Sequence, residues 1–360
     1  MQPPPSHRFA HLDALRGVAS LSVVFSHYIT FFVGLQRPDL ESIQQFFRAA
    51  AKSPALLFFS ASPPVLLFFV LSGFVLTFML TRQKASFGAY AIRRICRIWL
   101  PYFASLMFAL TCIALIGWSP SSEYSEWFNK LNGHDIELMQ LLKHIFLVGY
   151  FETDAYNFVV WTLVYEMRIS LVFPLIYWCL CRTTLKRAVV SSLIAGMGSC
   201  VLAFLFKRYG SEAGMDYALT AHYAVFFVVG SLMAMHLKAV VDWYERLSKV
   251  QRVILTLFVL CSCLLPQMVP KDVIPYVLRH YLMLPGVAGI MLFALCAEAF
   301  KRLLQHRILL FFGHISYSIY LLHGIVLLSI VGLFYRQLPL PVFLSIGFAV
   351  TILLSWLCYR

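Results

Sequence analysis

The chain has 360 residues, of which 61% are apolar and only 12% are charged, and its formal net charge is +13. Soluble domains are nearer half apolar and about a quarter charged. The apolar excess is too large for one buried core, which excludes an ordinary soluble domain. It indicates a polytopic membrane protein, in which lipid replaces water as the outer solvent.

Ten continuous apolar stretches are long enough to cross a bilayer, which takes about 20 residues of α-helix. Barrel strands would alternate apolar and polar residues, so we expect helices and an all-α fold. We find no internal repeat and no linker, and we expect one transmembrane domain over residues 1–360. The expected spans are residues 14–34, 62–81, 98–117, 159–181, 188–206, 218–236, 253–269, 276–297, 309–332 and 340–359.

The basic residues are divided unequally between the two sides of the membrane that these spans define. With a cytoplasmic N-terminus, 18 of the 29 Lys and Arg residues fall on the cytoplasmic side and 10 on the other. This asymmetry follows the positive-inside rule, so we expect the N-terminus in the cytoplasm. Topology thereby accounts for most of the positive charge, and nucleic acid is not an expected partner.

The first span carries two ionisable residues, Arg16 and His27, eleven positions apart. A helix turns 100° per residue, so the two side chains share a face and lie roughly 16 Å apart along the axis. Ionisable residues inside a membrane span are costly and are functional candidates by default. A neutral imidazole can accept the proton of a hydroxyl, which makes His27 the best general base; the structural alternative is a hydrogen bond between helices.

Three arginines, Arg93, Arg94 and Arg97, lie in the expected cytoplasmic loop before the third span. They could grip phosphate groups bidentately, or they could dock on anionic lipid headgroups and fix the topology. The axial gap between Arg16 and His27 is comparable to the reach of a pantetheine arm. An acyl-CoA with its phosphates near these arginines could therefore place its thioester beside His27.

Two loops on the opposite side are long, residues 35–61 and 118–158. The second mixes aromatic and polar residues, so it could bind the face of a sugar or be an interfacial loop of ordinary composition. Its residues 138–151 are too short to span the bilayer and predict a re-entrant or interfacial segment.

Polar residues inside later spans indicate a polar interior cavity. Glu166 in the fourth span could orient His27, as a carboxylate orients the base of a triad, or it could pair with a buried arginine such as Arg168. His323 in the ninth span fits a structural role better than a catalytic one. Ser72, in the second span, belongs to a small Ser-Gly pair that allows close helix approach or leaves room for a substrate chain.

Five stretches in chain order resemble the motifs of acyltransferase family 3, a family of integral membrane O-acyltransferases. They are Leu12-Asp13-Ala14-Leu15-Arg16-Gly17 followed by His27, Phe68-Phe69-x-x-Ser72-Gly73-Phe74, Arg94-x-x-Arg97 with Pro101, Trp161-x-Leu163-x-x-Glu166 with Pro174, and Gly313-x-Ile315-Ser316-Tyr317-Ser318-Ile319-Tyr320-Leu321-x-His323. Each motif alone is weak, but five in order make chance matches an inadequate explanation. Thr162 stands where the family usually has Ser, and Val75 where Leu is common.

The resemblance implies about ten helices in a cell inner membrane. It implies transfer of an acyl group, usually acetyl, from cytoplasmic acyl-CoA to a sugar hydroxyl of a surface glycan, glycolipid or exopolysaccharide precursor. It makes Arg16 and His27 the essential pair, and Arg94 and Arg97 the donor contacts. We predict catalytic residues His27, Arg16 and Glu166; donor-binding residues Arg93, Arg94 and Arg97; and substrate-binding residues Ser72, Trp161 and His323. No metal is expected.

Two other classes of function could use the same residues. A transporter or flippase for a lipid-linked or acylated substrate would also need a polar cavity and a basic mouth, and it predicts no turnover of acyl-CoA. An assembly scaffold in a glycan-synthesis complex predicts that neutral substitutions of His27 have no effect. The sequence also leaves open whether transfer is direct or passes through an acyl-histidine.

Overall fold

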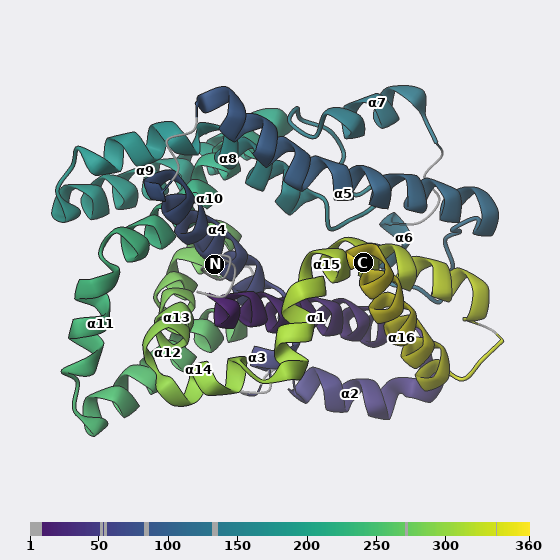
Figure 1. The fold of residues 1–360 in the computed structure, drawn as a ribbon. Coiled ribbons are helices and arrows are strands. Elements are labelled where there is room, and N and C mark those ends of the chain that lie inside the picture. The colour runs from purple at the N-terminus through teal and green to yellow at the C-terminus, as the bar shows by residue number, and fades with distance from the viewer. Residues whose placement is uncertain are drawn as a thin grey trace. The chain divides into compact units, whose positions relative to one another are not determined.

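The computed structural model describes residues 9–50, 53, 56–82, 86–131, 136–270, 273–335 and 337–360. Within these ranges the regular structure is helical and contains no strand (Figure 1). Ten helices of the described chain are long and apolar enough to cross a membrane, which is the number that the sequence predicted. The all-α polytopic membrane fold is therefore confirmed.

The ten spans agree with the predicted ranges to within a few residues, apart from the third. They are α1 (Ala10–Gly34), α4 (Ser62–Arg82), α5 (Phe87–Ile116), α8 (Trp161–Cys181), α9 (Leu185–Arg208), α10 (Glu212–Met235), α12 (Lys249–Met268), α13 (Tyr276–Cys296), α15 (Arg307–Phe334) and α16 (Leu340–Tyr359). The shorter helices are η2 (Pro38–Leu40), α2 (Glu41–Ala50), α3 (Leu56–Phe59), α6 (Glu126–Lys130), α7 (Leu138–Phe146), α11 (Leu237–Glu245) and α14 (Glu298–Leu304).

The third span required a correction, because α5 begins at Phe87 and not near residue 98. The three arginines predicted to lie in a loop are thus part of the helix. Arginine is a good helix former, and its long aliphatic stem lets a membrane helix continue into the headgroup region. A hydropathy-based boundary stops at the first charged residue and misses this extension.

Residues 138–151 do not span the membrane, as predicted. The helix that they contain, α7, is only nine residues long. Leu138, Met139 and Phe146 on it are exposed while His144 is fully buried. An apolar exposed face on a short helix is typical of an element that lies in the membrane interface.

The chain forms two compact units, each assembled from separate segments. Unit 1 comprises Met1–Ala61, Cys96–Val164 and Arg307–Arg360, and unit 2 comprises Ser62–Ile95 and Tyr165–His306. The boundaries fall inside α5 and α8, so both helices contribute residues to each unit.

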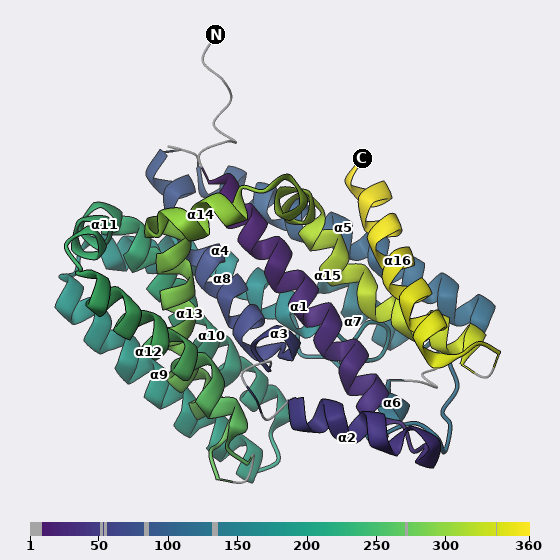
Figure 2. The same cartoon turned by 90° about the horizontal axis from the view of Figure 1, so that it is seen from below.

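Unit 1 is organised around the contact of α1 with α15, and α16 packs on α15 in turn (Figure 2). The two helices meet backbone to backbone at Gly17 and Gly313. A Cβ atom at Gly17 would lie 2.5 Å from the amide nitrogen of Gly313, and one at Gly313 would lie 2.6 Å from the carbonyl carbon of Asp13. Only glycine allows this approach, which fixes α1 against α15.

The C-terminal end of α1 is capped from the short helix α2. The buried side chain of Gln44 donates from Nε2 to the carbonyl oxygens of Phe32, at 3.0 Å, and of Leu35, at 2.9 Å. The Leu35 carbonyl belongs to the end of the helix, where carbonyl groups lack an intrahelical partner, and the Phe32 carbonyl also accepts from the backbone N–H of Leu35 at 3.3 Å. The amide therefore stabilises the end of the span that carries His27.

Unit 2 has its own close helix crossing, between α4 and α10. A Cβ atom on Gly73 would overlap the carbonyl group of Phe227, and one on Gly230 would overlap that of Val70. The Ser72-Gly73 pair thus allows close helix approach, which was one of its two predicted uses.

Two polar networks fill the interior of unit 2. Arg168 donates to Asp216 at 2.6 Å and to the Thr220 hydroxyl at 3.0 Å. His222 is hydrogen-bonded through Nδ1 to the Tyr281 hydroxyl at 2.8 Å and through Nε2 to Nδ1 of His280 at 3.0 Å. Buried polar groups are stable in such surroundings only when they are paired in this way.

Candidate functional site

His27 lies on α1 in unit 1, half-buried in a cage of aromatic rings. The Trp127 ring stacks on it with centroids 5.9 Å apart and an interplanar angle of 10°. Phe158 meets it edge to face at 4.9 Å, and the His323 ring stacks at 5.4 Å. Aromatic rings surround the imidazole, and no hydrogen bond to its ring nitrogens is found among the described residues. Those nitrogens are therefore available to a ligand.

His323, on α15, is fully buried beside His27. Its Nδ1 lies 3.1 Å from the carbonyl oxygen of Ile319. A carbonyl only accepts, so Nδ1 carries the proton and Nε2 of the neutral ring carries a lone pair. No described residue donates to Nε2.

Asn157, which precedes α8, adds a second buried acceptor. It contacts α15 at Leu321, two residues before His323. Its Nδ2 donates to the carbonyl oxygen of Leu321 at 2.9 Å, while its Oδ1 is buried without a donor among the described residues. Buried acceptors are normally satisfied, and leaving one unpaired costs about 1–3 kcal/mol. A ligand that brings a hydroxyl or an amide N–H next to His27 would satisfy such atoms.

Arg16 occupies the other end of the same helix. Because α1 is continuous from Ala10 to Gly34, Arg16 and His27 share a face and lie roughly 16 Å apart along the axis. Arg16 Nη1 lies 3.4 Å from Oδ1 of Asp13, and its side chain is 21% exposed. The guanidinium group is thus oriented by a local carboxylate at the N-terminal end of the span.

Glu166, on α8 in unit 2, is bound to an arginine. Arg94 donates to Glu166 Oε1 at 2.9 Å and to the Ser170 hydroxyl at 3.1 Å. Ser72 donates to the same carboxylate oxygen at 3.2 Å. Of the two options that the sequence left open, the structure shows the ion pair with a buried arginine. A role of Glu166 in orienting His27 stays a prediction.

The three arginines of α5 have different surroundings. Arg94 is only 6% exposed and is engaged inside unit 2, whereas Arg93 and Arg97 are exposed. Guanidinium groups that already bind a buried carboxylate are poorly placed to bind a donor phosphate. Arg93 and Arg97 differ from Arg94 in being exposed, and donor contact by any of the three stays a prediction.

The remaining predicted substrate residues come from α4 and α8. Ser72 is buried and bound to Glu166 as described, and Trp161 is the half-buried first residue of α8. The hydroxyl of its neighbour Thr162 lies 2.7 Å from the Tyr320 hydroxyl of α15. Threonine, which stands where the family usually has serine, thus keeps a hydroxyl group that makes a hydrogen bond. Substrate contact by Ser72 and Trp161 stays a prediction.

The residues 118–158, predicted to be a loop that could meet a sugar, supply two of the rings around His27. Trp127 belongs to α6, whose first turn is capped by Ser125, and Phe158 lies shortly before α8. Residues 132–135 of this segment are outside the described residues. Sequence reasoning did not single out Asn157, Phe158 or the ring of Trp127, because aromatic and polar residues are ordinary in a surface loop.

The cage in unit 1 can support proton transfer. One imidazole has nitrogens open to a ligand, and a second imidazole beside it offers a lone pair at Nε2. Among the described residues, no three His, Cys, Asp or Glu side chains are grouped as metal ligands. The two imidazoles can supply a base acting on a hydroxyl or a nucleophile acting on an ester.

Comparisons with known proteins place the chain in a family. A family model described as an acyltransferase domain, Acyl_transf_3, matches residues 9–360, which contain every predicted site residue. No curated protein matches the chain, and no solved structure does. The family match extends over essentially the whole length and agrees with the motifs found in order along the sequence. The chain belongs to acyltransferase family 3.

Proposed function

We propose that this protein is a membrane-bound O-acyltransferase of a cell inner membrane. It transfers an acyl group, expected to be acetyl, from cytoplasmic acyl-CoA to a sugar hydroxyl of a surface glycan, glycolipid or exopolysaccharide precursor. Family membership supports acyl transfer, and it disfavours a transporter or a scaffold. The observation that carries the proposal further is the His27 imidazole, caged by rings and open at its nitrogens.

In the direct route, His27 accepts the proton of the sugar hydroxyl as the oxygen attacks the thioester carbonyl. The tetrahedral intermediate then expels the CoA thiolate, which takes the proton from His27, so the products are the ester and free CoA. In a relay, His27 itself attacks the thioester and expels the CoA thiolate; the sugar hydroxyl then attacks the acyl-histidine, which releases the imidazole, and the hydroxyl proton passes to the thiolate. Both routes need an unencumbered ring nitrogen at the same place.

Arg16 serves the donor in this proposal. A guanidinium group roughly 16 Å along the helix from His27 cannot contact a thioester carbonyl that lies beside His27. It can bind the phosphate end of the same donor, since arginine recognises phosphate bidentately. The exposed Arg97, which like Arg16 belongs to unit 1, would add to this contact. Donor binding by Arg93 stays a prediction, and the ion pair of Arg94 with Glu166 supports unit 2.

The test compares His27 with a histidine outside the cage. Cells that lack the gene receive the wild type, His27→Ala or His314→Ala, and the surface glycan is analysed by mass spectrometry. His314 is an exposed residue of α15 that stacks on Tyr359, which makes it a matched control. We expect the wild type and His314→Ala to restore the ester, and His27→Ala to lower it roughly 100-fold or more at equal protein levels.

Two outcomes would overturn the proposal. The first is an ester level in His27→Ala cells equal to that of the wild type. The second is the absence of acyl-CoA turnover in purified wild-type protein supplied with radiolabelled acetyl-CoA and the host glycan. Unacylated substrate trapped on one side of the membrane would instead indicate a transporter.

A further inference from the structure

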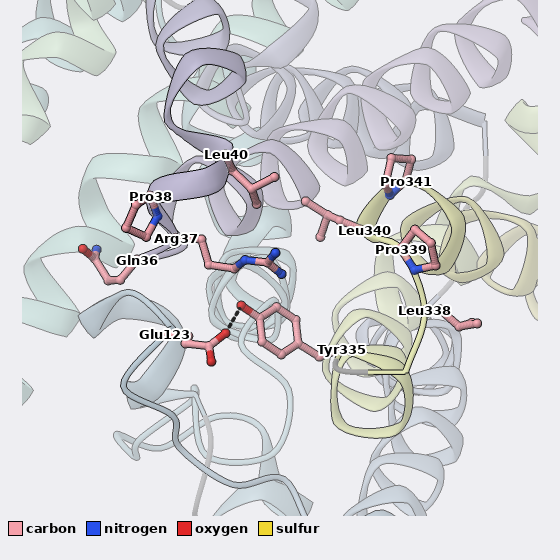
Figure 3. A pocket seen from close by; sticks show the side chains of 10 residues that line it. All are labelled: Gln36, Arg37, Pro38, Leu40, Glu123, Tyr335, Leu338, Pro339, Leu340 and Pro341. Carbon is pink, nitrogen blue, oxygen red and sulfur yellow. Dashed lines mark hydrogen bonds between the residues drawn. The ribbon is translucent and has the colours of Figure 1, made fainter.

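A recess of about 850 Å³ opens in unit 1 near the C-terminal end of α1, away from Arg16. This volume is typical of small-molecule sites, which measure about 300–1,000 Å³. Figure 3 shows Arg37, Glu123 and Tyr335 converging on it from three segments of the chain. Its walls include Pro38, Leu338, Pro339 and Pro341.

The polar groups of the recess form two pairs. Tyr335 donates to Glu123 Oε2 at 2.7 Å. Arg37 donates from Nε and Nη2 to the two carboxylate oxygens of Asp39, at 3.0 and 2.5 Å. Burial and the Glu123 carboxylate raise the pKa of Tyr335, so its hydroxyl stays protonated and remains a donor.

Among the described residues that line the recess, Arg37 supplies a positive charge and Glu123 a negative one, while Asp39, which pairs with Arg37, is not part of the lining. The Glu123 carboxylate disfavours an anion, such as a phosphate or a uronate. The Arg37 guanidinium group disfavours a cation at the same place. An uncharged ligand with many hydroxyl groups meets both donors and acceptors here without this penalty.

The walls suit such a ligand as well. Binding sites combine mostly apolar walls with a few well-placed polar groups. Sugar rings present apolar C–H faces between hydroxyl-bearing edges, and the proline and leucine walls match those faces. Proline rings are already fixed, so ordering them on binding costs little conformational entropy.

The recess is connected to His27 by the segment that leads into α6. Tyr124 packs edge to face on Tyr335 at 5.1 Å, and three residues later Trp127 stacks on His27. The end of α1 at Gly34 is roughly 10 Å along the helix axis from His27. The recess therefore lies toward the His27 half of α1, and a sugar seated in it would reach the imidazole when the buried rings of Phe31 and Phe128, which pack with Tyr335 and Tyr124, move aside.

We propose that this recess binds uncharged sugar residues of the acceptor glycan and presents a neighbouring hydroxyl to His27. The inference rests on the proposed function and adds the class of acceptor, a neutral oligosaccharide segment. With a cytoplasmic N-terminus, the recess belongs to the non-cytoplasmic side, where a surface glycan precursor would be met.

The test measures glycan binding separately from acyl transfer. Glycan released from the host envelope by mild acid is divided into neutral and acidic pools, and each pool is dialysed against the full-length protein in lipid nanodiscs. We expect the neutral pool to bind to the wild type and to His27→Ala. Glu123→Gln should lower that binding at least tenfold by weakening the Tyr335 pair, and Leu338→Trp should lower it by filling the recess.

Glu41→Gln is the matched control, since Glu41 is an exposed carboxylate that binds Arg48 at 3.0 Å on α2, outside the recess. It should bind glycan like the wild type. Leu338→Trp keeps the test decisive if Glu123→Gln folds poorly, which thermal unfolding of each variant would show.

The inference is overturned if neither pool binds, if the acidic pool binds better, or if Glu123→Gln and Leu338→Trp both bind like the wild type. The proposed function fails differently: the neutral pool binds through Glu123, yet wild-type protein transfers no acyl group to it. Conversely, His27→Ala could be inactive while Glu123→Gln and Leu338→Trp keep the wild-type KM for the acceptor. That result would refute glycan binding in the recess and would support the proposed acyltransferase function.

Discussion

At the residue scale, the position of His27 depends on the rings around it. Among these rings, that of His323 offers a hydrogen-bond acceptor. Its Nε2 is buried and carries a lone pair, while its Nδ1 donates to the Ile319 carbonyl oxygen. We expect His323→Asn to lower kcat for acyl transfer about tenfold or more with little change in the KM for acyl-CoA. Asparagine can keep the donor to Ile319 but lacks an atom at the place of Nε2.

The matched variant is His323→Gln, whose amide can reach the Nε2 position and should recover part of kcat. Both variants are compared by steady-state kinetics and thermal unfolding. A purely structural role of His323 would be indicated if His323→Asn and His323→Gln lost kcat equally and in proportion to their loss of thermal stability.

His144 on α7 should make stability depend on pH. Its ring is buried, Nε2 donates to the Glu152 carbonyl oxygen at 3.0 Å, and Nδ1 lies 3.1 Å from the Tyr102 hydroxyl. Burial lowers the pKa of His144 from 6.5 to about 4, so the folded protein keeps the ring neutral while the unfolded chain takes up a proton as the pH falls below 6.5. The folded state is therefore destabilised progressively between pH 6.5 and about 4.

Between about pH 7.5 and pH 5 this effect amounts to about 2 kcal/mol. Hydrogen exchange of the α7 amides, corrected for the intrinsic pH dependence, would measure it as reduced protection at the lower pH. His144→Asn removes the titrating group and should flatten the difference. Equal protection at both pH values in the wild type would contradict the prediction.

His27 and Arg16 could be found from sequence because an ionisable residue stands out in an apolar span. Asn157 and Trp127 could not, because their segment has the composition of any interfacial loop. The pair of Arg94 with Glu166 joins residues 72 positions apart, and only the packing of α5 on α8 within unit 2 reveals it.

At the element scale, the long spans were predictable because hydropathy is a local property of twenty residues. The start of α5 was not, since charged residues continue a helix that hydropathy alone would end. The sequence predicted a close approach of two helices only where small residues are adjacent, as at Ser72-Gly73. Gly17 and Gly313 belong to recognisable motifs, yet their contact joins opposite ends of the chain.

The crossing of α1 and α15 carries the next prediction. We expect Gly313→Ala to destabilise the protein by about 1–3 kcal/mol, because the added methyl group would meet the backbone of α1 at Asp13. Forcing these helices apart would also separate His27 from His323, so acyl transfer should fall further than the folded fraction does.

Gly198→Ala on α9 is the control, since nothing lies within 4 Å of a Cβ atom there. It should unfold at the wild-type temperature or slightly above it, because alanine is the better helix former. Thermal unfolding in nanodiscs checks both variants. Equal midpoints for Gly313→Ala and Gly198→Ala would show that the α1–α15 crossing tolerates separation.

At the scale of the whole molecule, unit 1 is built from three separate segments of the chain and unit 2 from two, and this was not predictable from sequence. Unit 1 brings the first helix together with the last two, and it is here that His27, Asn157 and His323 meet. Hydropathy gives the order of spans but not which spans are neighbours, because every span has an apolar surface that would suit lipid or another helix. The order of family motifs indicated common function without indicating this arrangement.

Ten spans and the bias of basic residues predict which side each connection faces. A cytoplasmic N-terminus places the connection of α9 to α10 at Gly210 outside and that of α11 to α12 at Leu247 in the cytoplasm. We expect alkaline phosphatase, which folds only in an oxidising compartment, to be active when fused after Gly210 and inactive when fused after Leu247. A fluorescent protein that folds in the cytoplasm should give the opposite result. The reverse pattern would invert the topology, and it would place the Arg16 end of α1 on the side that lacks acyl-CoA, so the donor site proposed there would be refuted together with the orientation.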